Sequence, residues 1–170
     1  MIRAAGLAVT PWANGAGRKA DIASGDGWLL GFAWLEKDAP FSDYQGHDRT
    51  IMLVEGLGFS LELPAGRTIA VTERFRPVAF DGAGPIGCQV KGPCRVLNAI
   101  SVYPWYSHTM QVVSGAELVA GPGVYGVVLR GSLGGAGVLD TVVLSESVTA
   151  SEDALVAVVR FERDSDGRGG

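Results

Sequence analysis

The chain consists of short apolar runs that end every few residues at glycine, proline or aspartate, and helical periodicity is almost absent. Residues 59–63 alternate strictly between apolar and polar side chains, which places Phe59, Leu61 and Leu63 on one face of a strand. Residues 68–72 and 86–91 repeat this alternation. Glycine supplies 25 of 170 residues without a three-residue period, which indicates many tight turns. Many short strands joined by such turns predict an all-β sandwich or jelly-roll barrel.

Three other runs, 28–35, 51–54 and 155–159, are apolar at every phase. Strands have this composition when both of their faces are buried, so we expect a structure of stacked β layers. A faint repeat relates residues 52–56 to residues 127–131. Each copy is followed by a strand that begins with threonine, a polar turn and a further apolar strand. The repeat suggests two related β halves.

Length and composition predict one domain over residues 1–163, with approximate halves 1–105 and 106–163. Hydrophobic residues make up 47% of the chain and charged residues 19%, which excludes disorder for most of it. The polar, glycine-rich tail 164–170 is expected to be disordered. A net charge of -4 and scattered basic residues argue against a nucleic-acid partner.

No apolar run approaches the length of a membrane span, and the apolar stretch 4–9 is too short for a secretory signal. We therefore expect a cytoplasmic protein without a membrane partner. Cys88 and Cys94 have neither the spacing nor the nearby histidine of a zinc site. They are interpreted as reduced core thiols, with a regulatory disulfide as the alternative.

The sequence gives little support for a dinucleotide site, a serine nucleophile or a metal site. Residues 82–87 and 121–126 match Gly-x-Gly-x-x-Gly, but strand-like sequence follows each match where a dinucleotide site requires a helix. No Gly-x-Ser-x-Gly is present, and His47 and Asp48 beside Ser42 would point to opposite faces of a strand. His47 and His108 are the two histidines, without ligand spacing, so we expect neither a metal nor another cofactor.

Polar residues on strand faces that are otherwise apolar say more about a binding site. Asn98 shares a strand face with Val96 and Ile100, where a buried amide must be hydrogen-bonded. It either pins a neighbouring loop or contacts a ligand. Arg49 is in phase with apolar residues of its strand. It either pairs with one of three acidic residues or holds a ligand carboxylate in a forked contact; the acidic residues are Asp43, Asp48 and Asp81.

The loop 12–17, Trp-Ala-Asn-Gly-Ala-Gly, carries one large aromatic side chain among small and polar residues. Asn14 either caps the turn or offers its amide to a bound molecule.

Taken together, these segments resemble the HutD/Ves family of cupin-fold proteins. Residues 11–17 resemble the family's Trp-x-Asn-Gly-Gly-Gly opening, and residues 40–49, Pro-Phe-Ser-Asp-Tyr-Gln-Gly-His-Asp-Arg, are similar to its Pro-Phe-Ser signature, which ends in arginine. The resemblance covers roughly residues 11–100. It implies a double-stranded β-helix with two cupin-like halves in one compact unit. It also implies a non-enzymatic role linked to histidine utilisation or to stress response.

The chain departs from the family pattern at several positions. Ala16 replaces a glycine, Lys19 stands where threonine is common, and Leu29 and Gly31 replace an arginine and a serine. The segment 95–99, Arg-Val-Leu-Asn-Ala, lacks the family's aspartate before Leu-Asn. If that arginine and serine hold the family's ligand, this chain binds a different ligand or none.

We therefore expect a metal-free cupin protein that binds a small polar or anionic metabolite as a sensor or accessory factor in catabolism. The alternatives are a metal-independent isomerase or hydrolase that uses His47 or His108 for proton transfer, and a structural domain that binds a protein partner. A homodimer is left open. The expected ligand contacts are Trp12, Asn14, Phe41, Ser42, His47, Arg49 and Asn98.

Overall fold

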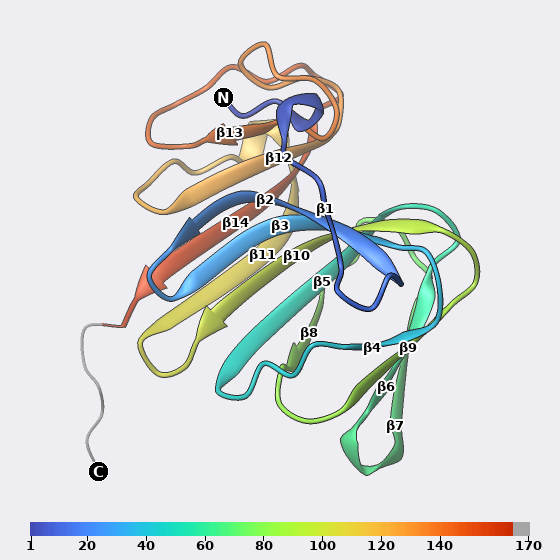
Figure 1. Ribbon diagram of the computed structural model, residues 1–170. Coiled ribbons are helices and arrows are strands. Elements are labelled where there is room, and N and C mark those ends of the chain that lie inside the picture. The colour runs from blue at the N-terminus through green and yellow to red at the C-terminus, as the bar shows by residue number, and fades with distance from the viewer. Residues whose placement is uncertain (165–170) are drawn as a thin grey trace.

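The computed structural model describes residues 1–164 and is built almost entirely of antiparallel strands (Figure 1). Residues 165–170, most of the tail predicted to be disordered, lie outside the described residues. The strands are β1 Thr10–Pro11, β2 Gly17–Gly25, β3 Trp28–Leu35, β4 Ala39–Phe41, β5 His47–Glu55, β6 Phe59–Leu63, β7 Arg67–Val71, β8 Val78–Asp81, β9 Ile86–Val90, β10 Cys94–Val102, β11 Tyr106–Ser114, β12 Val124–Arg130, β13 Thr141–Val143 and β14 Leu155–Arg163. Three short 3-10 turns accompany them: η1 Ala4–Gly6, η2 Pro64–Gly66 and η3 Gly115–Glu117.

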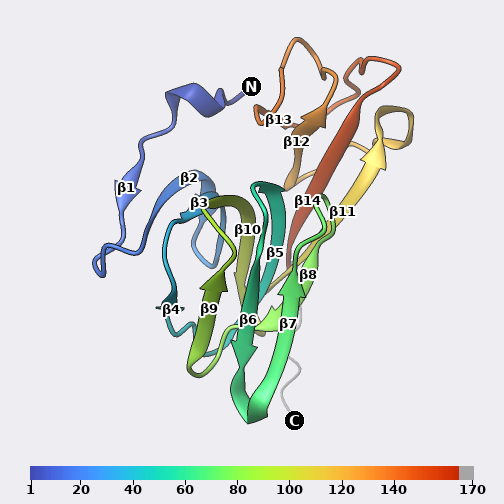
Figure 2. The same ribbon diagram turned by 90° about the vertical axis from the view of Figure 1, so that its right-hand side faces the viewer.

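The strands form three sheets. A central six-stranded sheet has the order β1-β2-β3-β10-β5-β8, and the two four-stranded sheets have the orders β11-β14-β12-β13 and β4-β9-β6-β7. Both views place β13 and the β6–β7 hairpin at opposite ends of the molecule (Figures 1 and 2). Two separate clusters of buried side chains show that one four-stranded sheet packs against each face of the central sheet.

Alternating side chains on the central strands supply both interfaces. On β5, Met52 and Val54 pack toward the β11-β14-β12-β13 sheet, whereas Ile51 and Leu53 pack toward the β4-β9-β6-β7 sheet. All four side chains are at most 3% exposed. This arrangement explains why residues 51–54 are apolar at every position, since a strand between two layers has no solvent face.

The N-terminal segment is anchored to the β11-β14-β12-β13 sheet before it reaches the central sheet. Ile2 exchanges backbone hydrogen bonds with Thr141, and Arg3 Nη1 lies 2.6 Å from Asp140 Oδ2. From there the chain runs through β1, which pairs with β2 at the edge of the central sheet. Figure 2 shows this segment at one side of the molecule. The anchoring fixes the course of the loop 11–14.

Cys88 and Cys94 are free and buried in the interface between the central sheet and the β4-β9-β6-β7 sheet. Burial raises the pKa of Cys88 to about 12 and that of Cys94 to about 11. Because the thiolate is the reactive form, we expect a thiol reagent such as Ellman's reagent to label neither cysteine in the native protein at pH 8, and both in denaturant. Rapid native labelling, or a disulfide in freshly prepared protein, would contradict this expectation.

Candidate functional site

A cavity of about 380 Å³ lies on the face of the central sheet that also carries the β4-β9-β6-β7 sheet. Its floor comes from β2, β3, β10 and β5, and its walls come from the loop 11–14 and from residues 40–44. Six residues predicted as ligand contacts line it: Trp12, Asn14, Phe41, Ser42, Arg49 and Asn98. The structure thus brings together side chains that are far apart in the sequence.

Arg49 is the most unusual residue of the cavity. It is 6% exposed, yet Nε and Nη1 are buried without a hydrogen-bond partner among residues 1–164. The third nitrogen, Nη2, lies 3.4 Å from the side-chain oxygen of Asn98. In the part of the chain that the structure describes, no carboxylate forms an ion pair with Arg49, which includes the three aspartates considered from the sequence.

Aromatic rings surround the guanidinium. Its carbon lies 5.1 Å from the ring centroids of Phe41 and Tyr44 and 5.3 Å from that of Phe80. Such contacts stabilise a cation without neutralising its charge. Burial lowers the pKa of Arg49 to about 10, although Tyr44 opposes part of this shift. Arg49 therefore remains a cation at neutral pH, and the N–H groups of two of its nitrogens have no partner in the described part of the chain.

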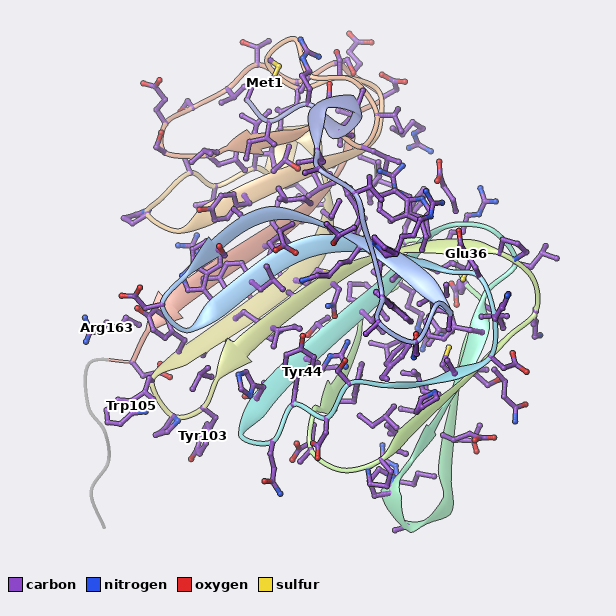
Figure 3. The ribbon with its side chains drawn as sticks, in the orientation of Figure 1. Met1, Glu36, Tyr44, Tyr103, Trp105 and Arg163 are labelled. Atoms are coloured by element: carbon purple, nitrogen blue, oxygen red, sulfur yellow. The ribbon has the colours of Figure 1, made fainter. Side chains whose placement is uncertain are left out.

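The other predicted residues form the rim and the walls. Trp12 packs edge-on against Phe41, with ring centroids 6.1 Å apart. Asn14 accepts a hydrogen bond from the backbone N–H of Ala16, so its oxygen caps the turn while the residue also lines the cavity. Ser42 is exposed at the rim. Figure 3 shows Tyr44 on the segment that leads into β5.

His47 is not among the residues that line the cavity. It begins β5, its Nδ1 lies 2.9 Å from the backbone oxygen of Gln45, and its ring packs against Tyr44. His108 lies against the opposite face of the central sheet. Its two ring nitrogens lie 2.9 Å from Thr50 Oγ1 and 2.7 Å from Ser101 Oγ. Burial lowers the pKa of His108, against a smaller opposing effect of Asp48.

Several lining residues were not predicted as contacts, namely Pro11, Ala13, Lys19, Asp21, Leu29, Gly31, Phe32, Ala33, Leu35, Pro40, Tyr44 and Ile51. Three of the departures from the family pattern, Lys19, Leu29 and Gly31, are therefore in the cavity itself. Arg95, in the segment that lacks the family's aspartate, does not line the cavity: its guanidinium stacks on Phe32 at 4.3 Å and lies 3.6 Å from Glu55.

Metal ligands do not gather at this site. Across residues 1–164, no group of three or more His, Cys, Asp or Glu side chains is placed to hold an ion. The same residues include no helix that is long and apolar enough to cross a membrane.

Comparison with known proteins identifies the family. The HutD family profile matches residues 4–152. The chain belongs to the HutD family. It is 28% identical over 134 residues to an uncharacterized 21.2 kDa protein in the hutC 3' region of Pseudomonas putida, which covers 70% of each chain.

Two solved structures show the fold. HutD from Pseudomonas fluorescens SBW25, solved in a formate condition, superposes with a TM-score of 0.79 at 21% identity over 96% of this chain and 97% of that one. A cupin 2 conserved barrel domain protein from Leptotrichia buccalis superposes with a TM-score of 0.58 at 11% identity, over 86% and 88% of the two chains. The all-β, cupin-like fold predicted from the sequence is confirmed.

Proposed function

We propose that the cavity binds the carboxylate of a small metabolite through Arg49, and that the protein acts as a non-enzymatic sensor or accessory factor in histidine utilisation. The observation that carries this proposal is the pair of unpartnered, buried nitrogens on Arg49. A buried charge without a partner costs free energy, and a planar carboxylate matches the forked donors of a guanidinium. A carboxylate ligand removes this cost.

The shape and composition of the cavity support a small ligand. About 380 Å³ is near the lower end of the volumes of small-molecule sites, which are mostly apolar with a few convergent polar groups. Here Trp12, Phe41 and Tyr44 supply aromatic walls, and Arg49 and Asn98 supply the polar contact. A purely structural β-domain would fill this space with core side chains, so the cavity argues for ligand binding.

The positions of the histidines support a binding role over the alternative of an isomerase or hydrolase. General acid–base catalysis needs a titratable group within hydrogen-bond reach of the substrate. His47 lies beyond the lining, and His108 lies on the other face of the central sheet between two hydroxyl groups. The histidine-utilisation context comes from the HutD family, as does the choice of urocanate and formylglutamate as ligands to test, whereas formate is the smallest carboxylate probe.

The test compares wild-type protein with Arg49→Met by titration calorimetry and by thermal melts, using formate, urocanate and formylglutamate. We expect wild type to bind at least one of them, and Arg49→Met to lose about 1.5–3 kcal/mol of binding free energy, the scale of a charge-assisted hydrogen bond. Methionine keeps an apolar stem against the surrounding rings, so the unliganded melting temperature should stay close to that of wild type.

Arg74→Met is the matched control, because Arg74 is exposed and lies outside the cavity. It should bind like wild type and show the same ligand-induced rise in melting temperature. If Arg49→Met bound these carboxylates as tightly as Arg74→Met, Arg49 would not be the anion contact. A large fall in its unliganded melting temperature would assign Arg49 to the core instead.

A further inference from the structure

A second charged group faces the cavity opposite Arg49. Asp21, Gly31, Asn98 and Ile51 form one row across β2, β3, β10 and β5, and all four line the cavity. Because neighbouring strands are about 4.8 Å apart, the backbones of Asp21 and Asn98 are about 10 Å apart. Arg49 reaches this row, since its Nη2 lies 3.4 Å from Asn98 Oδ1.

The floor between the two charged groups is open. Gly31 lies between Asp21 and Asn98 in the row and contributes no side chain. A Cβ at Gly31 would lie 2.8 Å from the backbone oxygen of Ala20, closer than side-chain carbons approach in real structures. Glycine is therefore required here by packing, and it leaves no side chain between Asp21 and Asn98 in this row.

Lys19 is the competing cation at the Asp21 end. Its Nζ lies 3.6 Å from Asp21 Oδ1, and the two side chains are about half exposed, at 49% and 51%. A pair of this kind contributes little free energy, so the nitrogen of a ligand can replace it. Lys19 also lies one step farther along β2 from the Arg49 end, because it pairs with Ala33 whereas Asp21 pairs with Gly31.

From this placement we propose that the cavity selects zwitterions: small metabolites with a carboxylate at the Arg49 end and a nitrogen cation, such as an ammonium or amidinium group, at the Asp21 end. This inference rests on the proposed carboxylate contact at Arg49 and adds the chemical class of the ligand. Asp21 contributes specificity by opposing a second negative charge and by leaving a simple anion unmatched at that end.

The experiment measures affinities for matched ligand series by titration calorimetry. β-Alanine, γ-aminobutyrate and δ-aminovalerate are compared with propionate, butyrate and valerate, and glutarate serves as the dianion. We expect the best amino acid of the series to bind wild type about tenfold tighter than the alkanoate of equal chain length, and glutarate to bind more weakly than that amino acid.

Three variants assign the selectivity. Asp21→Asn should bring the amino acid and the alkanoate to nearly equal affinity while leaving the alkanoate's affinity unchanged. Lys19→Gln should increase the preference for the amino acid, because it removes the competing cation. Asp26→Asn makes the same charge change in the exposed turn between β2 and β3, outside the cavity, and should leave the preference unchanged.

The two proposals fail in different ways. Equal affinities of wild type for amino acids and alkanoates, or tightest binding of glutarate, would overturn the zwitterion inference while the Arg49 contact stood. Selectivity that survived Asp21→Asn would also overturn it. If neither the series nor formate bound wild type, or if Arg49→Met bound alkanoates unchanged, the proposed function itself would fail.

Discussion

Asn98→Asp is expected to make the unliganded protein more stable and to weaken carboxylate binding. The substitution exchanges an amide for a carboxylate of the same shape, 3.4 Å from the buried guanidinium of Arg49. Breaking a buried ion pair costs about 3–5 kcal/mol because it leaves a buried charge without a partner. Arg49 already lacks such a partner among residues 1–164. Supplying a carboxylate at residue 98 should therefore raise the free energy of unfolding by about 1–3 kcal/mol.

The same carboxylate occupies the donors that a ligand would use. We therefore expect the affinity for formate or any alkanoate to fall by about ten- to a hundredfold, the scale of a lost charge-assisted hydrogen bond. One substitution would thus increase the stability of the fold and weaken ligand binding. Denaturant titration gives the first quantity, and titration calorimetry gives the second.

The added stability should depend on pH in a defined direction. The guanidinium lowers the folded-state pKa of the introduced carboxyl below its unfolded value of about 3.9. The gain should therefore be complete above about pH 5 and should disappear as the pH falls through the folded pKa. The comparison of variant with wild type across pH 2.5–8 measures this directly.

Asn14→Asp is the control for Asn98→Asp. Asn14 also lines the cavity, and a carboxylate there keeps the hydrogen bond from Ala16, so the charge change is the same without the contact to Arg49. Its unfolding free energy should stay near that of wild type. Destabilisation by Asn98→Asp, or full ligand affinity in that variant, would show that the guanidinium is not an unfilled anion site.

Much of the fold could be predicted because strand periodicity is a local property of the sequence. The alternating run 59–63 forms β6, with Phe59 and Leu61 fully buried, and the run 28–35 forms β3 with the same bounds. Arg49 and Asn98 could be singled out for the same reason, since a polar residue in phase with apolar neighbours is visible within one strand.

Lys19, Asp21 and Tyr44 could not be recognised as cavity residues in this way. Lys19 and Asp21 alternate with buried Ala20 on β2, so the local pattern predicts that both side chains lie on an ordinary solvent-facing side of the strand. What brings Asp21 level with Gly31 and Asn98 is the pairing register, which shifts at a bulge between Asp21 and Ala23. Register depends on partner strands far away in the sequence, and no local pattern reports it.

His47 shows the converse limitation. His47 is two residues before Arg49 on β5, so the two side chains are expected on the same face of the strand. On sequence grounds this makes His47 a reasonable ligand contact. The structure places it one step nearer the start of the strand, where its ring packs against Tyr44 and its Nδ1 meets the backbone of Gln45. Strand parity predicts which face a residue occupies, but the segment 40–44, which supplies a wall of the cavity, comes from outside the strand.

The layered core allows stability to be separated from binding. Phe59 is fully buried in the interface that also contains Leu35, Phe41 and Ile51, three residues that line the cavity. Leu144 is equally buried, at 1% exposure, but belongs to the cluster that covers the outer face of the β11-β14-β12-β13 sheet. Truncating either Phe59 or Leu144 to alanine would leave a void in a packed region. Only the Phe59 truncation does so in the layer that supports the candidate site.

We therefore expect Phe59→Ala to lower the free energy of unfolding by about 3–5 kcal/mol and Leu144→Ala by about 2–5 kcal/mol. At a temperature where both variants remain folded, Phe59→Ala should also weaken carboxylate binding severalfold, whereas Leu144→Ala should bind like wild type. Leu57→Ala, at a side chain that is 70% exposed, should change stability by less than about 0.5 kcal/mol and serves as the surface control. Equal losses of affinity in Phe59→Ala and Leu144→Ala would mean that binding follows global stability, and that the layer beneath Phe41 and Ile51 has no separate role in shaping the cavity.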